Sequence, residues 1–249
     1  MFAHENLKVY HCAVEFVGTA GTISSEWDKR HAIVDHLDRA AESVVLNLAE
    51  AARLPATSAR VQIIDYAVGS ALECAACLDI AAAKTLIAKD LLRKRSFHCA
   101  KSSKCLSDCG RFGRRLVLPK NRIHTISRGE QPLFNHEKLD VYQVSLSFIR
   151  WFTTETVTSE LSARSFRQLD EAATSLVLNV AEGNGRYAEL DHRRFLGIAE
   201  MSAVKAAAYL DVLTKRNRLA LGEGKKLLGR VVAMLRKMWH SAASFVAFS

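Results

Sequence analysis

The residues with the greatest potential for chemistry form a block of positive charge at positions 91–128. This block holds eleven Lys and Arg residues and one acid, Asp108, so its net charge is +10 while the whole chain carries +9. The remaining sequence is therefore nearly neutral, at −1. A local excess of one sign is what a surface for a polyanion such as RNA or DNA requires, although a solvated face or a basic linker has the same composition.

The spacing within the block separates basic from apolar residues. At about 100° per residue in a helix, Leu92, Cys99 and Leu106 share one arc. Five basic residues cluster on the opposite side: Lys94, Lys101, Lys104, Arg111 and Arg115. We expect these five to be nucleic-acid-binding residues that contact phosphates, with little base stacking because the block holds only two aromatic residues.

Patterns for metal or redox chemistry are weak elsewhere in the chain. Cys74 and Cys77 have the spacing of half a zinc or redox site, but no second pair matches them, so core packing is the expected role of the cysteines. A di-iron bundle needs two Glu-x-x-His motifs, and the sequence holds one, from Glu189 to His192. We find no serine–histidine arrangement or phosphate-binding glycine loop, and we expect no catalytic residue, metal or cofactor.

An internal duplication determines the expected architecture. A shift of 132 residues places LDRAAESVVLNLAE (37–50) on LDEAATSLVLNVAE (169–182) with 10 of 14 positions identical, and no gap is needed elsewhere. Apolar residues recur at spacings of three and four, which predicts amphipathic helices. We therefore expect an all-α fold of two tandem antiparallel four-helix bundles, at residues 1–118 and 136–249, joined by a linker at 119–135.

Each copy has an asparagine between apolar residues of its second helical segment, followed three residues later by a glutamate. These polar pairs are Asn47 with Glu50 and Asn179 with Glu182. A buried asparagine needs hydrogen-bond partners, so we expect a structural role, either in a bond to another helix that fixes register or at an oligomer interface. The segments are expected to end at these glutamates, with Gly183 as a left-handed stop.

Three motifs in these segments carry a family resemblance. They are L-x-V-Y-Q at 139–143, N-x-A-E-G at 179–183 and G-S-x-x-E at 69–73; copy two has Lys205 in place of the last glutamate, and copy one lacks the glycine. In these motifs the chain resembles the four-helix-bundle proteins encoded in intervening sequences of large-subunit ribosomal RNA genes, and the related accessory bundle protein of diversity-generating retroelements. The resemblance implies a non-enzymatic bundle, oligomerisation and a basic surface suited to nucleic acid.

The overall composition limits the remaining possibilities. No apolar run is long enough for a transmembrane helix, and the first residues lack the pattern of a secretory signal, so we expect a cytoplasmic protein without membrane contact. The leading prediction is a non-enzymatic nucleic-acid-binding or nucleoprotein-accessory protein, with RNA or DNA as partner. The alternative is a structural interaction module that binds a protein partner or forms a homo-oligomer.

Overall fold

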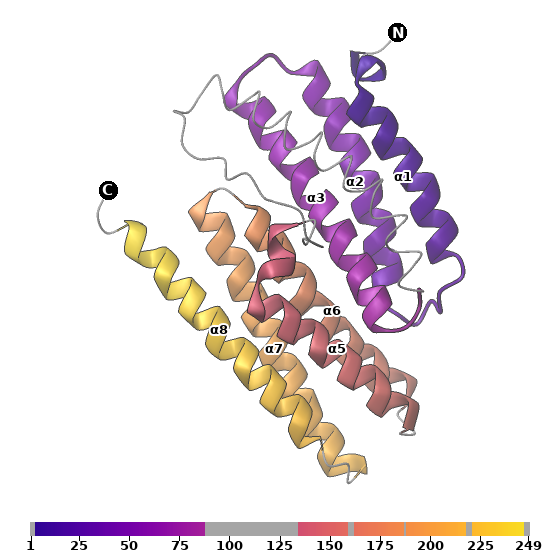
Figure 1. Ribbon diagram of the computed structural model, residues 1–249, viewed down its shortest axis with the longest axis vertical. Coiled ribbons are helices and arrows are strands. Elements are labelled where there is room, and N and C mark those ends of the chain that lie inside the picture. The colour runs from indigo at the N-terminus through magenta and orange to yellow at the C-terminus, as the bar shows by residue number, and fades with distance from the viewer. Residues whose placement is uncertain (1–2, 88–133, 159–161, 187, 218–220, 247–249) are drawn as a thin grey trace, which may run out of the picture.

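The structure is a computed structural model that describes residues 3–87, 134–158, 162–186, 188–217 and 221–246 (Figure 1). Copy one contains a short 3-10 helix, η1 (Ala3–Asn6), and three α-helices: α1 (Lys8–Ser24), α2 (Ile33–Arg53) and α3 (Ser58–Ala83). Copy two contains η2 (Asn135–Lys138), α5 (Asp140–Thr158), α6 (Ala163–Gly185), α7 (Glu189–Asn217) and α8 (Gly222–Val246). These ranges contain no strand, and the expected all-α fold of two tandem bundles is confirmed.

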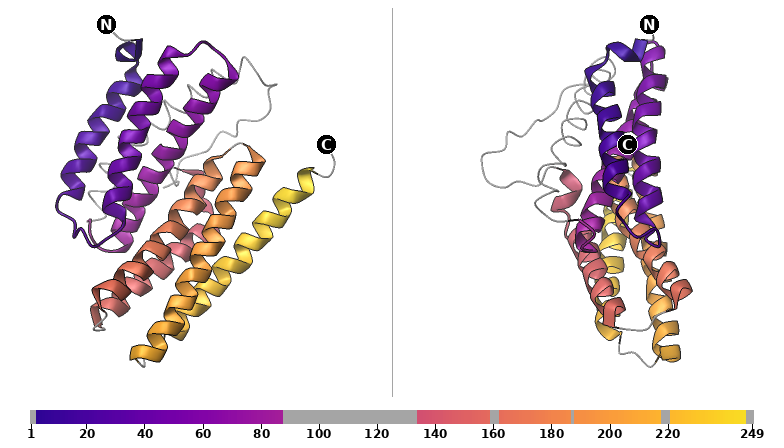
Figure 2. Two further views of the ribbon diagram at one scale, coloured as in Figure 1. Left: turned by 180° about the vertical axis from the view of Figure 1, so that it is seen from behind. Right: turned by 90° about the vertical axis from the view of Figure 1, so that its right-hand side faces the viewer.

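The two copies have the same helix order. In copy two, α5 and α7 each lie beside both α6 and α8, which closes an antiparallel four-helix bundle (Figure 2). In copy one, α2 lies between α1 and α3. The basic block at 91–128, whose spacing predicts a helix, lies outside the described residues.

Amphipathic spacing explains why these segments fold as helices. The buried residues of α2 recur at intervals of three and four, from Ile33 through Leu37, Val44 and Leu48 to Ala51. The start of α6 is capped by Ser162, whose hydroxyl accepts a hydrogen bond from the Ser165 backbone N–H at 3.2 Å. None of the described helices combines the length and the apolar character needed to cross a bilayer.

The two bundles share a continuous apolar core. Helix α3 packs against α6 and also contacts α5, so buried residues from both copies join in one cluster. Cys74 and Cys77 lie fully buried in this cluster as free thiols, which is consistent with the expected packing role. The remaining cysteines of the Cys99–Cys109 region lie outside the described residues.

The expected glycine stop at the end of the second helix is wrong. Helix α2 continues to Arg53 and α6 to Gly185, and no glycine among the described residues has a positive φ. Gly183 is instead a helical residue at a close approach between α6 and α7, because an added Cβ would lie 2.9 Å from the Cβ of Phe195. Steric room between two helices therefore explains this glycine.

Candidate functional site: the interface between the two copies

The polar residues that are buried most deeply gather where copy one meets copy two. We use the term inter-copy interface for the contact of α3 and the start of α2 with η2, α5 and α6. Three polar contacts lie along α3 within this interface. They are a buried ion pair, a tyrosine–aspartate hydrogen bond and an arginine that packs against a glycine. Each of the three is built from residues of both copies.

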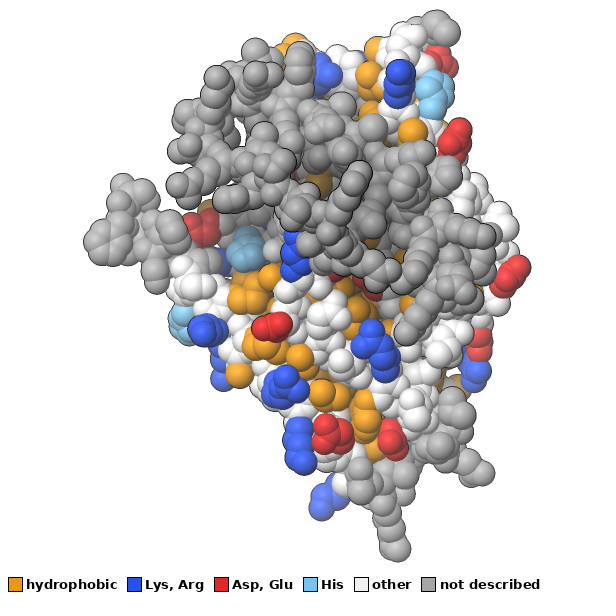
Figure 3. Space-filling view, in the orientation of Figure 1, with side chains coloured by type: hydrophobic (Ala, Val, Ile, Leu, Met, Phe, Trp, Pro, Cys, Tyr) orange, Lys and Arg blue, Asp and Glu red, His pale blue; other side chains and the backbone are white. Residues whose placement is uncertain are grey.

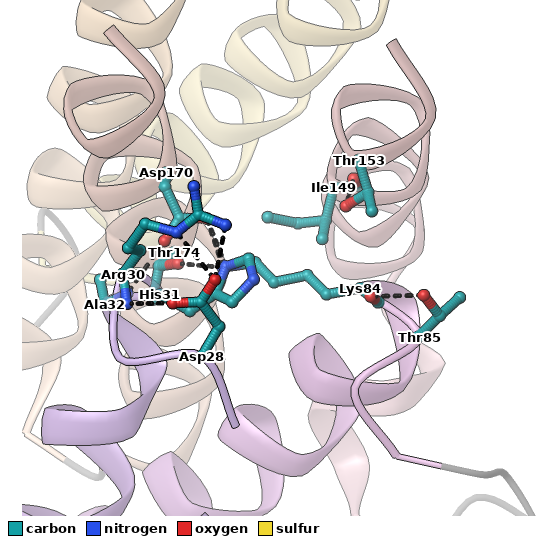
Figure 4. A network of polar contacts seen from close by, with 10 residues as sticks. All are labelled: Asp28, Arg30, His31, Ala32, Lys84, Thr85, Ile149, Thr153, Asp170 and Thr174. Atoms are coloured by element: carbon teal, nitrogen blue, oxygen red, sulfur yellow. Dashed lines mark hydrogen bonds and ion pairs between the residues drawn. The ribbon is translucent and has the colours of Figure 1, made fainter. Parts of the chain in front are cut away.

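The ion pair joins the end of α3 to the first turns of α6 (Figure 4). The Lys84 ammonium lies 2.5 Å from Asp170 Oδ1 and 3.3 Å from the Thr174 hydroxyl, and the two charged side chains are 1% and 0% exposed. Asp170 Oδ2 accepts a hydrogen bond from the Ala32 backbone N–H at 2.9 Å, and the His31 ring lies beside it. Asp170 thus holds the ends of two helices of copy one.

Burial and charge act in opposite directions on this pair. Burial lowers the pKa of Lys84 below its ordinary value, although the nearby Asp170 carboxylate favours the ammonium. Burial also disfavours ionised Asp170, but its contacts with His31 and Lys84 outweigh that effect and leave its pKa lowered. The carboxylate of Asp170 and the ammonium of Lys84 thus each favour the charged form of the other, and each depends on the other for compensation.

The second polar contact involves Asp79, which lies five residues before Lys84. The Tyr142 hydroxyl of α5 donates a 2.8 Å hydrogen bond to Asp79 Oδ2 of α3. Burial raises the pKa of Asp79 to about 6 in spite of that bond, and burial lowers the pKa of His136 to about 4. The His136 ring is completely buried between Phe134 and Tyr142, with ring centroids 5.6 Å and 4.7 Å away.

This second contact also has the spacing of a possible metal site. Ligand atoms of Asp79, His136 and Glu137 lie within 4.8 Å of one another, which sequence inspection missed because the residues come from different copies. However, copy one has the same histidine–tyrosine ring pair, between His4 and Tyr10 at 4.6 Å. The recurrence of the pair in both copies supports ring packing as a role that they share.

The third contact places Arg186, just after α6, against the backbone of α3. A Cβ at Gly69 would lie 2.9 Å from the Arg186 guanidinium, so a larger residue there would require the guanidinium to move. The guanidinium pairs with Glu182 and lies over the rings of Tyr66 and Phe195. Glu182, predicted as a structural polar residue, is therefore an interface residue, whereas its counterpart Glu50 is exposed on α2.

The predicted asparagines belong to a network that is repeated in both copies. The Asn47 amide donates to the Ser43 carbonyl at 2.7 Å and to its hydroxyl at 3.0 Å, and the Ser43 and Ser70 hydroxyls join α2 to α3 at 2.8 Å. Copy two repeats these bonds with Asn179, Ser175 and Ser202 at 2.7, 3.2 and 2.9 Å. The serines make the bond between helices, and each asparagine supports it from within its own helix.

Two other expectations concern the Glu-x-x-His motif and the basic block. His192, the histidine of the single Glu-x-x-His motif, lies with Nδ1 2.7 Å from the Gly183 carbonyl oxygen and links the start of α7 to the end of α6. The five predicted nucleic-acid-binding residues, Lys94, Lys101, Lys104, Arg111 and Arg115, lie outside the described residues. The structure therefore provides a new candidate site, the inter-copy interface. The basic block, which is the candidate site predicted from the sequence, lies outside the described residues.

Comparison with known families supports the duplication. The model of the 23S rRNA-intervening sequence protein family matches residues 5–108 and again residues 137–240. The two matches are offset by the same 132 positions as the internal repeat. Comparisons with curated proteins and with solved structures find no match. The chain thus belongs to the family of 23S rRNA-intervening sequence proteins and contains the family's helical unit twice in tandem.

Proposed function

We propose that this protein is a non-enzymatic nucleic-acid-binding protein that acts as an accessory component of a nucleoprotein. The observation that carries the proposal is the charge distribution: residues 91–128 have a net charge of +10, and the rest of the chain is close to neutral. Membership of a family named for ribosomal RNA intervening sequences is consistent with this role. The five residues proposed to bind phosphates are Lys94, Lys101, Lys104, Arg111 and Arg115.

The described residues offer less to a polyanion than the block does. Several of their basic side chains are paired with acids, including Lys225 with Asp211 at 2.6 Å and Arg236 with Glu200 at 2.6 Å. On the face shown in Figure 3, Lys and Arg side chains of copy two lie among Asp and Glu. Mixed charges of this kind attract phosphates weakly, which supports assigning the binding role to the block.

The salt dependence of binding tests the proposal. Five phosphate contacts would give a slope of log affinity against log salt of roughly −4 to −5 on duplex DNA, at about 0.9 per contact. Replacing the five proposed residues with glutamine should flatten the slope and weaken binding to all sequences alike. Fluorescence anisotropy with labelled RNA and DNA duplexes of several sequences measures both quantities.

Helix α8 provides a matched control with the same loss of charge. The control replaces five basic residues of α8 with glutamine: Lys225, Lys226, Arg230, Arg236 and Lys237. We expect this variant to keep most of the affinity and of the salt slope. If the block variant binds as the parent does, or if the α8 variant alone loses binding, the assignment of the site is wrong. If the parent binds neither RNA nor DNA, the proposed function is wrong.

A further inference from the structure

The buried histidine of the inter-copy interface has no hydrogen-bond partner on either ring nitrogen. His136 is completely buried, and neither Nδ1 nor Nε2 reaches a donor or an acceptor among the described residues. Its ring is in contact with those of Phe134 and Tyr142. Buried polar atoms in proteins nearly always have a partner, so a bare imidazole at this depth indicates that a further group belongs beside it.

Two carboxylates lie beside this imidazole. Asp79 comes from α3 of copy one, and Glu137 follows His136 in η2 of copy two. One possible ligand atom of each residue lies within 4.8 Å of the other two. Around a zinc ion, ligand atoms bound at about 2.0–2.2 Å lie roughly 3.4 Å apart. The two acidic residues are only half-buried, so small rotations of their side chains would bring all three ligands to one ion.

A hydrogen bond already orients one of the three possible ligands. The Tyr142 hydroxyl donates to Asp79 Oδ2 at 2.8 Å. Outer hydrogen bonds of this kind fix the orientation of ligating carboxylates in metal sites. A carboxylate has about four lone-pair sites, so Asp79 can accept this bond and still bind an ion.

The duplication separates ring packing from ligand binding. The same residue types recur 132 positions away, as His4, Glu5 and Asp211. Within the described ranges these three form no second group of neighbouring ligands, and Asp211 pairs with Lys225 of α8 at 2.6 Å. His4 is also partly exposed, whereas His136 is buried. The ring pair is thus common to both copies, but the gathered ligands belong to the inter-copy interface.

The three ligand types favour one class of metal ion. One imidazole nitrogen and two carboxylates suit a borderline ion such as Zn²⁺, which binds nitrogen and oxygen ligands in tetrahedral geometry. With three protein ligands, a water molecule would complete the coordination. Ca²⁺ takes six or more oxygen ligands, and Mg²⁺ needs near-ideal octahedral geometry, so both fit this group of residues less well.

We propose that Asp79, His136 and Glu137 bind one Zn²⁺ ion, which ties the start of copy two to α3 of copy one. The ion gives a partner to the buried imidazole. Because its ligands come from both copies, it also stabilises the contact between η2 and α3. The site contains no residue of the basic block, so this inference stands independently of nucleic-acid binding.

Calorimetric titration of the full chain with ZnCl₂, after treatment with EDTA, tests the site. We expect one equivalent of Zn²⁺ to depend on the three ligands, and MgCl₂ to give no binding there. Glu137→Gln, a half-buried change, and His136→Phe, which keeps an aromatic ring, should each weaken this binding by more than about a hundredfold. Loss of an outer hydrogen-bond partner alone typically costs roughly ten- to a hundredfold in metal affinity.

The other copy supplies matched controls for these variants. Glu5→Gln and His4→Phe change the same positions of the repeat and should bind Zn²⁺ as the parent does. Saturating Zn²⁺ should raise the urea midpoint of the parent and of both controls, but not that of Glu137→Gln. A parent that binds no Zn²⁺, or equal binding and equal midpoint shifts in Glu137→Gln and the parent, overturns the proposal.

Co²⁺ as a spectroscopic probe distinguishes this site from the cysteines of the chain. Nitrogen and oxygen ligands give Co²⁺ weak visible absorption bands, whereas a thiolate adds an intense charge-transfer band in the ultraviolet. The difference between the spectra of the parent and Glu137→Gln should contain the visible bands alone. A charge-transfer band in this difference spectrum would identify cysteine as a ligand and overturn the assignment.

Discussion

The buried pair of Lys84 and Asp170 provides the sharpest test of the interface described above. Lys84→Met leaves the Asp170 carboxylate without its cation, and Asp170→Leu leaves the ammonium without its anion. Because the two side chains are 1% and 0% exposed, solvent cannot replace the missing partner. Removing one member of such a pair typically costs about 3–5 kcal/mol of folding free energy.

The double variant Lys84→Met/Asp170→Leu removes both charges and should be much less destabilised than the sum of the single variants. Its main remaining penalty is the Ala32 backbone N–H, which loses its acceptor on Asp170. An unsatisfied buried donor costs about 1–3 kcal/mol. The expected coupling free energy is therefore at least about 3 kcal/mol in a double-mutant cycle.

Urea denaturation followed by circular dichroism measures these free energies. The duplicated chain supplies a matched control, since Arg216→Met changes the position of the repeat that corresponds to Lys84, where the residue is exposed. This control should alter the free energy of unfolding by only about 0.5 kcal/mol. If Lys84→Met is as mild as Arg216→Met, or if the single effects simply add, the reasoning from burial is refuted.

Two further predictions concern pH and helix contact. His136 has a folded-state pKa of about 4, below its ordinary 6.5, so in an Asp79→Asn variant stability should fall as the pH drops from 6.5 towards 4. Asp79 has a folded-state pKa raised from 3.8 to about 6, so in a His136→Phe variant stability should fall as the pH rises from 3.8 towards 6. Urea denaturation at a series of pH values measures the free energy of unfolding of both variants. If this free energy depends on pH with the same slope in the two variants, both assignments are contradicted. Gly183→Ala should destabilise the protein by about 1–3 kcal/mol, because its Cβ meets that of Phe195. Gly197→Ala, with nothing within 4 Å of its Cβ, should stabilise α7 by up to about 1 kcal/mol in thermal melts. A similar loss of stability in both glycine variants would contradict the close contact of Gly183 with Phe195.

The sequence was sufficient to predict the fold because helical periodicity is a local property. The apolar spacing of α2 and the 132-residue repeat identify the helices and the two bundles without any knowledge of tertiary contacts. The end of α6 was predicted wrongly because glycine serves two purposes: it permits a left-handed turn, and it permits close packing. Only the position of Phe195 distinguishes these roles for Gly183.

The inter-copy interface was not predicted, because it depends on how one bundle is oriented against the other. Lys84 and Asp170 are charged residues in segments that otherwise bury apolar side chains, and that contrast was the available signal. Differences between the copies were a second signal: Gly69 and Met201 occupy the same position of the repeat, and the glycine leaves room beside it for the Arg186 guanidinium. Comparison of the copies at unlike positions, as well as at matching ones, would have pointed to α3.

The contact of Arg186 with Gly69 bears on how a duplicated chain avoids misfolding. As the chain folds, α3 and α7 are similar enough to compete for the surface formed by α5 and α6. A side chain at the Gly69 position would meet the Arg186 guanidinium within 2.9 Å, and α7 presents Met201 at that position. To accept α7 there, the guanidinium would have to leave the rings of Tyr66 and Phe195, and the loss of these contacts would disfavour domain-swapped products in which the two copies exchange their third helices.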